Sequence, residues 1–320
     1  MAEFFTSLPS LSQACLLAVS VYLLKALLSH YLPHRPLAFF TFFCQLLANK
    51  VNRRDNASNQ QKLSGTIAIV VSLAPVVIIL WLFADFIEVI ELWHGLLLYL
   101  ALGGFGISHE SKAMAQALVA KQNYVAKQTL QTRVLRDTSE LSTMGLAKAN
   151  IEMQLLTFAQ QQVMIIGYFL LFGPLFALSC RLLLEMHYSW NHKQDSFRYF
   201  GQPIAAMVNL LQWPFSKTLG LLVLFSTIQQ NLVLHWRLSK QHLLTNNNNF
   251  LLHNGALALG VQLAGVAIYQ GKKLRRDSFN QQARQPEIRD IIAASRLVRL
   301  QKILLSVILL FIAIVPILLS

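Results

Sequence analysis

The feature that most constrains the fold of this 320-residue chain is a series of long apolar runs built from Leu, Ile, Val, Ala and Phe. Hydrophobic residues make up 55% of the sequence and charged residues only 13%, which is more apolar surface than one soluble core can bury. Several runs approach the roughly 20 residues that an α-helix needs to cross a hydrocarbon layer about 30 Å thick. They lack the sustained alternation of barrel strands. We therefore predict an all-α, polytopic integral membrane protein.

The runs that we interpret as apolar spans cover residues 11–32, 65–83, 92–107, 151–184, 204–234 and 303–319. The run over 151–184 is longer than one crossing needs and contains Gln160 to Gln162 and the pair Gly173 and Pro174. It is either a broken helix or a re-entrant pair, because irregular backbone at membrane depth must be buried in protein or line a wet cavity. We expect about five transmembrane helices in all, with further amphipathic or re-entrant segments. The topology of residues 185–201 stays open.

Charge sets the expected orientation and the expected partners. The 27 Lys and Arg residues outnumber the 14 Asp and Glu residues, which gives a formal net charge of +13. Basic segments over about 109–150 and 272–302 should be cytoplasmic by the positive-inside rule, and the second should touch anionic lipid. No nucleic-acid-binding module accompanies the charge. We expect a multi-pass protein of a bacterial inner membrane whose partner is the lipid bilayer, with no nucleic acid.

Metal ligands and common catalytic motifs do not stand out in the sequence. The three cysteines, Cys15, Cys44 and Cys180, are widely spaced, so we interpret them as buried thiols without disulfides. His187 and His192 are five residues apart, which fits one helical face poorly. No Walker-type phosphate loop, Gly-x-Ser-x-Gly elbow or His-Glu-x-x-His motif occurs. We predict no metal site and assign no catalytic residue.

A family resemblance rests on a collinear set of residues. The set comprises Arg136-Asp137-Thr138, Leu141, Lys148-Ala149, Glu152, Gly173, Ala177, Arg181, Phe200-Gly201, Ala205, Leu259-Gly260-Val261, Leu263, Gly265, Tyr269 and Gly271. With these residues the chain resembles the CobD/CbiB family of cobalamin biosynthesis, as one membrane domain over residues 1–320. The resemblance implies an inner-membrane synthase of the adenosylcobinamide-phosphate type, which joins an aminopropanol, or its phosphate, to adenosylcobyric acid through an amide bond. A corrinoid substrate is implied with it, and Mg²⁺ and ATP are implied only if that activity is retained.

The chain departs from the family pattern where the pattern carries carboxylates and amides. It has Leu156-Thr157 and Gln160-Gln161, then Leu184-Glu185-Met186-His187, then Ala206, Val208 and Asn209, and of the asparagine loop it keeps only Asn247. Activating a carboxyl group places phosphate charge in the site, usually with Mg²⁺ held by carboxylate oxygens, so we expect lost or altered activity. The alternative is a non-catalytic sensor or regulator similar to AmpE, a membrane relative associated with β-lactamase regulation. That similarity rests on Phe172-Gly173-Pro174, Tyr188, Trp190 and residues 211–214.

The resemblance implies a ligand site made of charged and polar residues. The candidates are Arg136, Asp137, Lys148, Glu152, Arg181, Lys217 and Asn247. For Arg136 and Asp137 the alternative is an interfacial salt bridge or a helix cap. Glu152 must find a partner at membrane depth, and Lys148 at i−4 is the expected one. Glu185 at i+4 should neutralise Arg181, and the glutamines should hydrogen-bond between helices.

Overall fold

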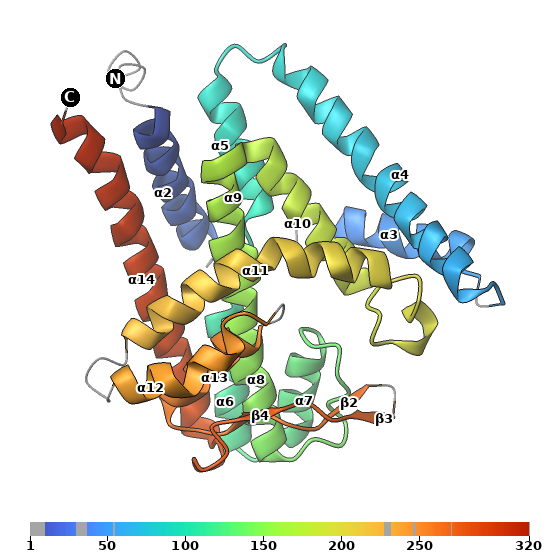
Figure 1. Ribbon diagram of the computed structural model, residues 1–320, viewed down its shortest axis with the longest axis vertical. Helices are drawn as coiled ribbons and strands as arrows, with labels where there is room; N and C mark the ends of the chain where they lie inside the picture. Colours follow the sequence, from blue (N-terminus) through green and yellow to red (C-terminus); the bar gives the residue numbers. More distant parts are fainter. Residues whose placement is uncertain are drawn as a thin grey trace. The chain divides into compact units, whose positions relative to one another are not determined.

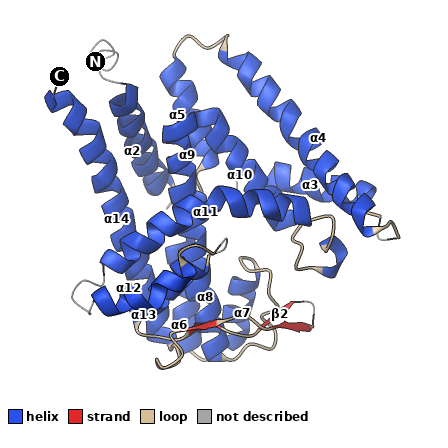
Figure 2. Cartoon of the chain, viewed as in Figure 1, coloured by secondary structure: helices blue, strands red, loops and turns tan. Residues whose placement is uncertain are grey.

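A computed structural model describes residues 10–29, 37–53, 55–226, 232–245, 248–269 and 271–319. The chain divides into two compact units. Unit 1 comprises residues 1–105, 161–211 and 303–320, and unit 2 comprises residues 106–160 and 212–302. Figure 2 shows that helices dominate the described chain and that strands are confined to the part that belongs to unit 2. The predicted all-α membrane fold is confirmed, and the prediction of one domain over 1–320 stays a prediction.

Unit 1 is a helical assembly centred on α10 (Figure 1). Its helices are α2 (Ser10–Leu28), α3 (Ala38–Val51), α4 (Ser58–Ala84), α5 (Ile90–Ala101), α9 (Met164–Phe172), α10 (Pro174–Ser189) and the short 3₁₀ helix η2 (Asp195–Phe197). It also contains the first part of α11 (Gln202–Phe225) and the last part of α14 (Ile288–Leu319). Helix α10 packs against α3, α4, α5 and α9. Its small and aliphatic side chains, such as Ala177 and Leu184, are fully buried there.

A sharp corner joins α9 to α10. Gly173 ends α9 with φ of 84°, and Pro174 follows at the first position of α10. The positive φ favours glycine, and proline suits the first turn of a helix because its missing N–H would have no partner there. The apolar run over 151–184 is therefore interrupted at Gly173, and the two helices that meet there pack against each other.

Close backbone approach holds α4 against the segment that follows η2. A Cβ atom at Gly65 would lie 2.2 Å from the backbone oxygen of Phe200. Phe200 also packs edge-on against the buried ring of Trp190, whose indole N–H donates to Cys44 O at 2.9 Å. The cysteines are buried free thiols, as predicted. Unit 1 thus contains a close approach of backbones at a small residue, which is usual for helices in membranes.

Unit 2 combines helices with two short antiparallel strand pairs. Its elements are α6 (Ile107–Val119), α7 (Asn123–Gln131), α8 (Thr143–Phe158), α12 (Leu232–Ser239), η4 (Lys240–His242), α13 (Asn249–Leu259), β1 (Leu263–Ala264), β2 (Ala267–Tyr269), β3 (Lys272–Leu274), β4 (Ser278–Phe279) and the adjoining parts of α11 and α14. Strand β1 pairs with β4, and β2 pairs with β3. An apolar core joins α6, α7, α8 and the start of α14 through residues such as Met114, Leu146 and Ile291.

Four helical segments are long and apolar enough to cross a membrane in the described parts of the chain. They are Ser10–Leu28, Ser58–Ala84, Thr143–Phe172 and Ile288–Pro316. Two predicted spans differ from this set. The run over 92–107 is mostly α5, which is only 12 residues long, and the run over 204–234 falls on α11 and α12, where polar residues such as Asn209, Gln212 and Lys217 interrupt the apolar stretch.

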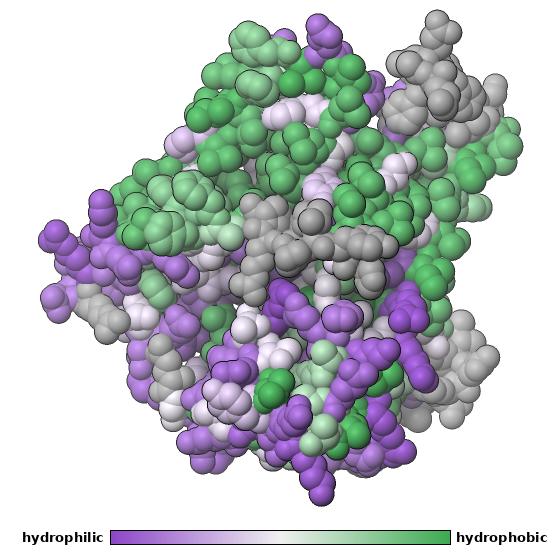
Figure 3. Space-filling view, turned by 180° about the vertical axis from the view of Figure 1, so that it is seen from behind, coloured by the Kyte–Doolittle hydropathy of each residue, from purple (hydrophilic) through white to green (hydrophobic). Residues whose placement is uncertain are grey.

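The two units expose different surfaces. In the space-filling view hydrophobic residues cover much of the helical surface of unit 1, whereas hydrophilic residues gather over unit 2 (Figure 3). On α4 of unit 1, Ile79 and Trp81 are more than 60% exposed, which suits a lipid-facing helix. Polar chemistry in unit 2 therefore has access to water.

Candidate functional site

A buried carboxylate on α8 organises unit 2. The Glu152 side chain is 2% exposed, and its Oε2 accepts hydrogen bonds from Nη2 of Arg136 at 2.9 Å and Nη2 of Arg276 at 3.2 Å. Its Oε1 accepts from the backbone N–H of Ala264 at 3.0 Å. Arg136 precedes α8, and Arg276 lies between β3 and β4. Glu152 thus ties three distant segments together.

The structure corrects the expected partner of Glu152. Lys148 lies at i−4 on α8 and is half-buried, yet the ion pairs of Glu152 go to Arg136 and Arg276. A guanidinium supplies several donors in a planar fork, which suits a buried carboxylate better than an ammonium does. Two guanidiniums against one carboxylate leave this cluster with a net charge of +1.

The other candidate beside Arg136 has a local role. The Asp137 carboxylate accepts from the backbone N–H of Ser139 at 2.9 Å and from its hydroxyl at 2.7 Å, and these bonds lower the pKa of Asp137. The Asp137 backbone N–H donates to Ile268 O on β2 at 2.9 Å. Three residues later Ser142 caps α8 by accepting from Gly145 N. This turn places Arg136 against Glu152.

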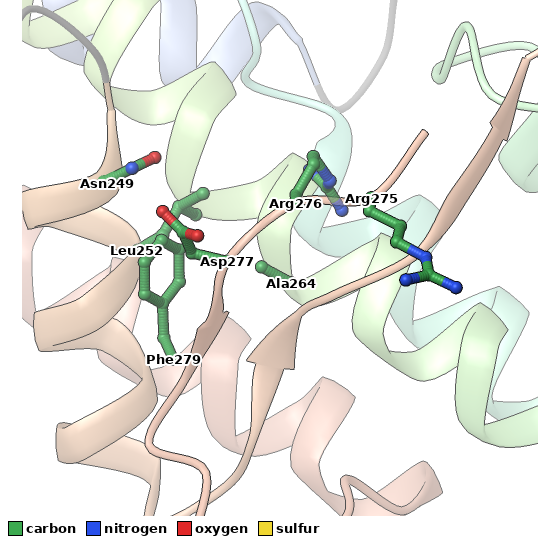
Figure 4. A pocket seen from close by; sticks show the side chains of 7 residues that line it. All are labelled: Asn249, Leu252, Ala264, Arg275, Arg276, Asp277 and Phe279. Atoms are coloured by element: carbon green, nitrogen blue, oxygen red, sulfur yellow. The ribbon is translucent and has the colours of Figure 1, made fainter. Parts of the chain in front are cut away.

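A pocket of about 280 Å³ lies beside this ion cluster. Its lining residues are Asn249, Leu252, Ala264, Arg275, Arg276, Asp277 and Phe279. Figure 4 shows Asp277, Phe279, Leu252 and Asn249 towards one end, the two arginines towards the other, and Ala264 between them. The pocket therefore has an anionic end and a cationic end. Ala264 adopts a positive φ of 59°, and its backbone faces Glu152 while its small side chain lines the pocket.

Arg276 connects the pocket with the ion cluster. Its Nε donates to Gly265 O at 3.3 Å and its Nη2 donates to Glu152. Within the described residues its Nη1 makes no hydrogen bond, and the side chain lines the pocket. Asp277 forms no ion pair with Arg275 or Arg276 in the described part of the chain. The cationic end of the pocket is thus not neutralised by its anionic end.

An apolar layer with two histidines lies next to the anionic end. The ring of Phe279 packs edge-on against His242 and His253, with centroids 5.5 and 5.7 Å apart. His253 is 7% exposed, and neither of its ring nitrogens finds a hydrogen-bond partner within the described chain. Burial and the nearby His242 and His235 lower the pKa of His253 to about 4. His253 is therefore neutral at pH 7. It lies at i+4 from Asn249, on the pocket face of α13.

Lys217 lies near this layer. Its Nζ donates to His242 O at 3.0 Å and stands 5.6 Å from the centroid of the Phe250 ring. Lys217 is buried on α11, and these contacts hold η4 and α13 against α11.

Arg181 belongs to unit 1, where it pairs with Glu185 as predicted. Its Nε and Nη1 are buried without a hydrogen-bond partner in the described chain. Nη1 and the side-chain oxygen of Gln161 approach Gly103 so closely that a Cβ there would lie 2.5 Å from each. The guanidinium is thus packed tightly against Gly103.

The predicted hydrogen bonding of the glutamines between helices is confirmed. The three residues lie in a π-helical turn, Ala159–Val163, between α8 and α9. In unit 1, Gln162 accepts from the Tyr22 hydroxyl at 2.8 Å and donates to Gly103 O at 2.9 Å. In unit 2, Gln160 donates to the Gln212 side chain at 2.7 Å. The π turn lets successive side chains reach different neighbours.

The structure brings together only part of the predicted set. Arg136 and Glu152 meet directly, and Asp137 meets β2 through its backbone. Asn247 lies outside the described residues. None of the six candidates that the structure describes is among the residues that line the pocket, which is reached from Glu152 through Arg276 and Ala264. The sequence signal for Arg275 and Arg276 was their basic segment, which we interpreted as a lipid contact.

The donor set of unit 2 limits how a metal ion could be held. Among the residues that the structure describes, no three His, Cys, Asp or Glu side chains gather as a metal site. Among its described lining residues the pocket has one carboxylate, Asp277, and one amide, Asn249. Mg²⁺ usually binds one or two carboxylates and takes its other ligands from water and substrate phosphates. This pocket fits such a shared ion, and it does not fit a metal held by protein ligands alone.

Comparison with known proteins identifies relatives of this chain. It is 28% identical over 215 residues to the cobalamin biosynthesis protein CobD of Chromobacterium violaceum, covering 67% of this chain and 68% of that protein. It is 26% identical over 254 residues to the protein of the same name from Stutzerimonas stutzeri, covering 79% of this chain and 83% of that protein. No solved structure matches.

A family model described as CobD/Cbib protein matches residues 17–298. The match includes the Glu152 cluster and every residue that lines the pocket. With most of its length matched, and with the membrane helices in place, the chain belongs to the CobD/CbiB family.

Proposed function

We propose that this chain acts in cobalamin biosynthesis at a bacterial inner membrane, as a synthase of the amide-forming type that joins adenosylcobyric acid to an aminopropanol or its phosphate. The family match over residues 17–298 and the CobD relatives support the pathway. One structural observation carries the site. The pocket of unit 2 has charged groups of opposite sign at its two ends, beside a buried cluster of net positive charge.

The pocket chemistry suits an amide-forming reaction. Activation of a carboxyl group by ATP supplies the leaving group and adds phosphate charge to the site. Arg275 and Arg276 would hold that charge, and Asp277 would be the protein ligand of a Mg²⁺ ion shared with the phosphates. Neutral His253 packs against Phe279, which lines the anionic end of the pocket.

The departures from the family pattern favour a weakened activity. Val208, which stands where the pattern carries a carboxylate, is 1% exposed. At Gln160 and Gln161 the amides are used in hydrogen bonds to Gln212 and Tyr188. These positions serve packing in this chain, so the synthase depends on the charges of the pocket. The alternative, a non-catalytic AmpE-like regulator, rests on the same observation and predicts no synthase activity at all.

Complementation tests the proposal. The full chain is expressed in a bacterium that lacks its own synthase of this family and needs cobalamin for growth, with cobyric acid supplied. The expected result is cobalamin-dependent growth above the empty vector and below that given by the Chromobacterium violaceum relative. Absence of growth, with the chain present in the membrane fraction at a level equal to the relative, would overturn the synthase and leave the regulator.

A further inference from the structure

We propose that Arg276 binds an anionic group of the pocket ligand through Nη1, and that Glu152 is a positioning residue that holds Arg276 in place for this contact. The proposal rests on the proposed function only in taking the pocket as the ligand site. It names an oxyanion, a carboxylate or a phosphate, as the group that meets the cationic end.

The orientation of Arg276 is fixed by two contacts. Nε donates to Gly265 O, and Nη2 donates to Glu152. A planar guanidinium held at these two nitrogens has no freedom left for Nη1. Nη1 is the nitrogen without a partner within the described chain, and Arg276 lines the pocket. The two contacts therefore present Nη1 to a ligand without any change of rotamer.

The charge of the cluster also calls for an anion. Glu152 balances one guanidinium, and both Arg136 and Arg276 contact the same Oε2 atom. Arg136 is 9% exposed, so its charge is largely withdrawn from water. A partly buried excess of one positive charge is stabilised by an oxyanion at hydrogen-bond distance. Asp277 does not supply it, because its carboxylate points towards Phe279 at the other end of the pocket (Figure 4).

Glu152 acts through Arg276 and does not itself reach the pocket. Its side chain is 2% exposed, and within the described chain its hydrogen bonds go to Arg136, Arg276 and the Ala264 backbone. It is absent from the pocket lining, whereas Ala264 and Arg276 are part of it. The carboxylate thus fixes two neighbouring parts of the pocket wall at once. A shorter carboxylate, as in Glu152→Asp, keeps the charge and draws Arg276 away from the pocket.

The test measures binding of inorganic phosphate and, separately, of acetate to the full-length protein in detergent by titration calorimetry. Arg276→Gln should weaken binding of the preferred anion at least about tenfold, since it removes a charge-assisted hydrogen bond. Arg284→Gln is the matched control, because Arg284 pairs with Asp290 in the same unit and does not line the pocket. The anion affinity of the Arg284→Gln variant should equal that of the unchanged protein. Preference for phosphate assigns a phosphate ester, and preference for acetate assigns a carboxylate.

Glu152→Asp separates positioning from simple stability. Its melting temperature should stay close to that of the unchanged protein, whereas anion affinity should fall several-fold. Free guanidinium ion should restore binding to Arg276→Gly and not to Glu152→Asp. The proposal is overturned if Arg276→Gln binds both anions as tightly as the unchanged protein, or if neither anion binds the unchanged protein. Failed complementation with these binding results intact would remove the synthase but not this site. Successful complementation together with unaltered anion binding by Arg276→Gln would remove this anion site but not the synthase.

Discussion

The two units of the molecule neutralise buried charge in different ways. In unit 1, Arg181 pairs with Glu185 four residues away on α10, so both partners come from one helix. In unit 2, Glu152 on α8 pairs with Arg136 and with Arg276, which is 124 residues away. The first pair compensates its own charge and leaves the packing around α10 apolar. The second cluster joins separate segments and keeps an excess charge next to a pocket. The Arg181–Glu185 pair thus neutralises charge within the packing of unit 1, whereas the Glu152 cluster keeps charge beside the proposed ligand site.

Removal of the Glu152 carboxylate is the strongest test of this contrast. Glu152→Ala leaves two buried guanidiniums without a counter-charge and also removes the bond to Ala264 N. Loss of one partner of a buried ion pair typically costs about 3–5 kcal/mol, so the free energy of unfolding should fall by about that amount. Denaturant titration in mixed micelles measures it. A loss below about 1 kcal/mol would show that the cluster stabilises the fold no more than an ordinary surface ion pair does.

Unit 1 should depend instead on close helix packing. Gly65→Ala places a Cβ 2.2 Å from a backbone oxygen of Phe200, which cannot move as a flexible side chain would. Overpacking of this kind costs about 1–3 kcal/mol, and thermal unfolding in detergent should register it. Gly95→Ala is the matched control in the same unit, since its Cβ would meet side-chain atoms at an ordinary 3.5 Å. Equal melting temperatures for the two variants would contradict the role of close approach.

Protonation of His253 gives unit 2 a pH dependence of its own. The pKa of His253 lies at about 4, below that of an exposed histidine near 6.5. Because the folded pKa is the lower one, the unfolded chain binds more protons between these values. The stabilisation by neutral His253 is therefore complete above about pH 6.5 and is lost as pH falls towards 4. Between pH 7.5 and 5 the unchanged protein should lose about 1–2 kcal/mol more than His253→Leu. Parallel pH profiles for the two proteins would exclude this histidine as the source.

Replacement of the unit 1 ion pair should have the smallest effect. Arg181→Met together with Glu185→Leu exchanges a buried pair for apolar side chains of similar size, which is often neutral or stabilising. We expect the free energy of unfolding to change by less than about 1 kcal/mol, with synthase activity, if present, retained. Single substitution of Glu185→Leu should be worse than the double one, because it leaves Arg181 uncompensated. A double variant that is less stable than the single one would show that the pair does more than neutralise charge.

The sequence predicts what is local and misses what is distant. The apolar runs, the break at Gly173 and Pro174, and the Arg181–Glu185 pair all follow from neighbours within a few residues. The prediction that Lys148 is the ion-pair partner of Glu152 was wrong. Lys148 is near Glu152 in sequence, whereas Arg276 is near it only in the folded chain. The strands β1 to β4 are only two or three residues long, too short for an alternating pattern to be recognised. Arg275 and Arg276 become pocket residues only through the pairing of β1 with β4.

The methyl group of Ala264 sits midway along the pocket, and its backbone alone serves Glu152. The charge of the ligand and the length of ligand that fits the pocket are therefore determined by different atoms. A bulkier residue that accepts the same left-handed backbone, such as asparagine, would divide the cavity while sparing every ionic contact. Relatives with shorter or longer ligands could thus arise by exchange at this one codon.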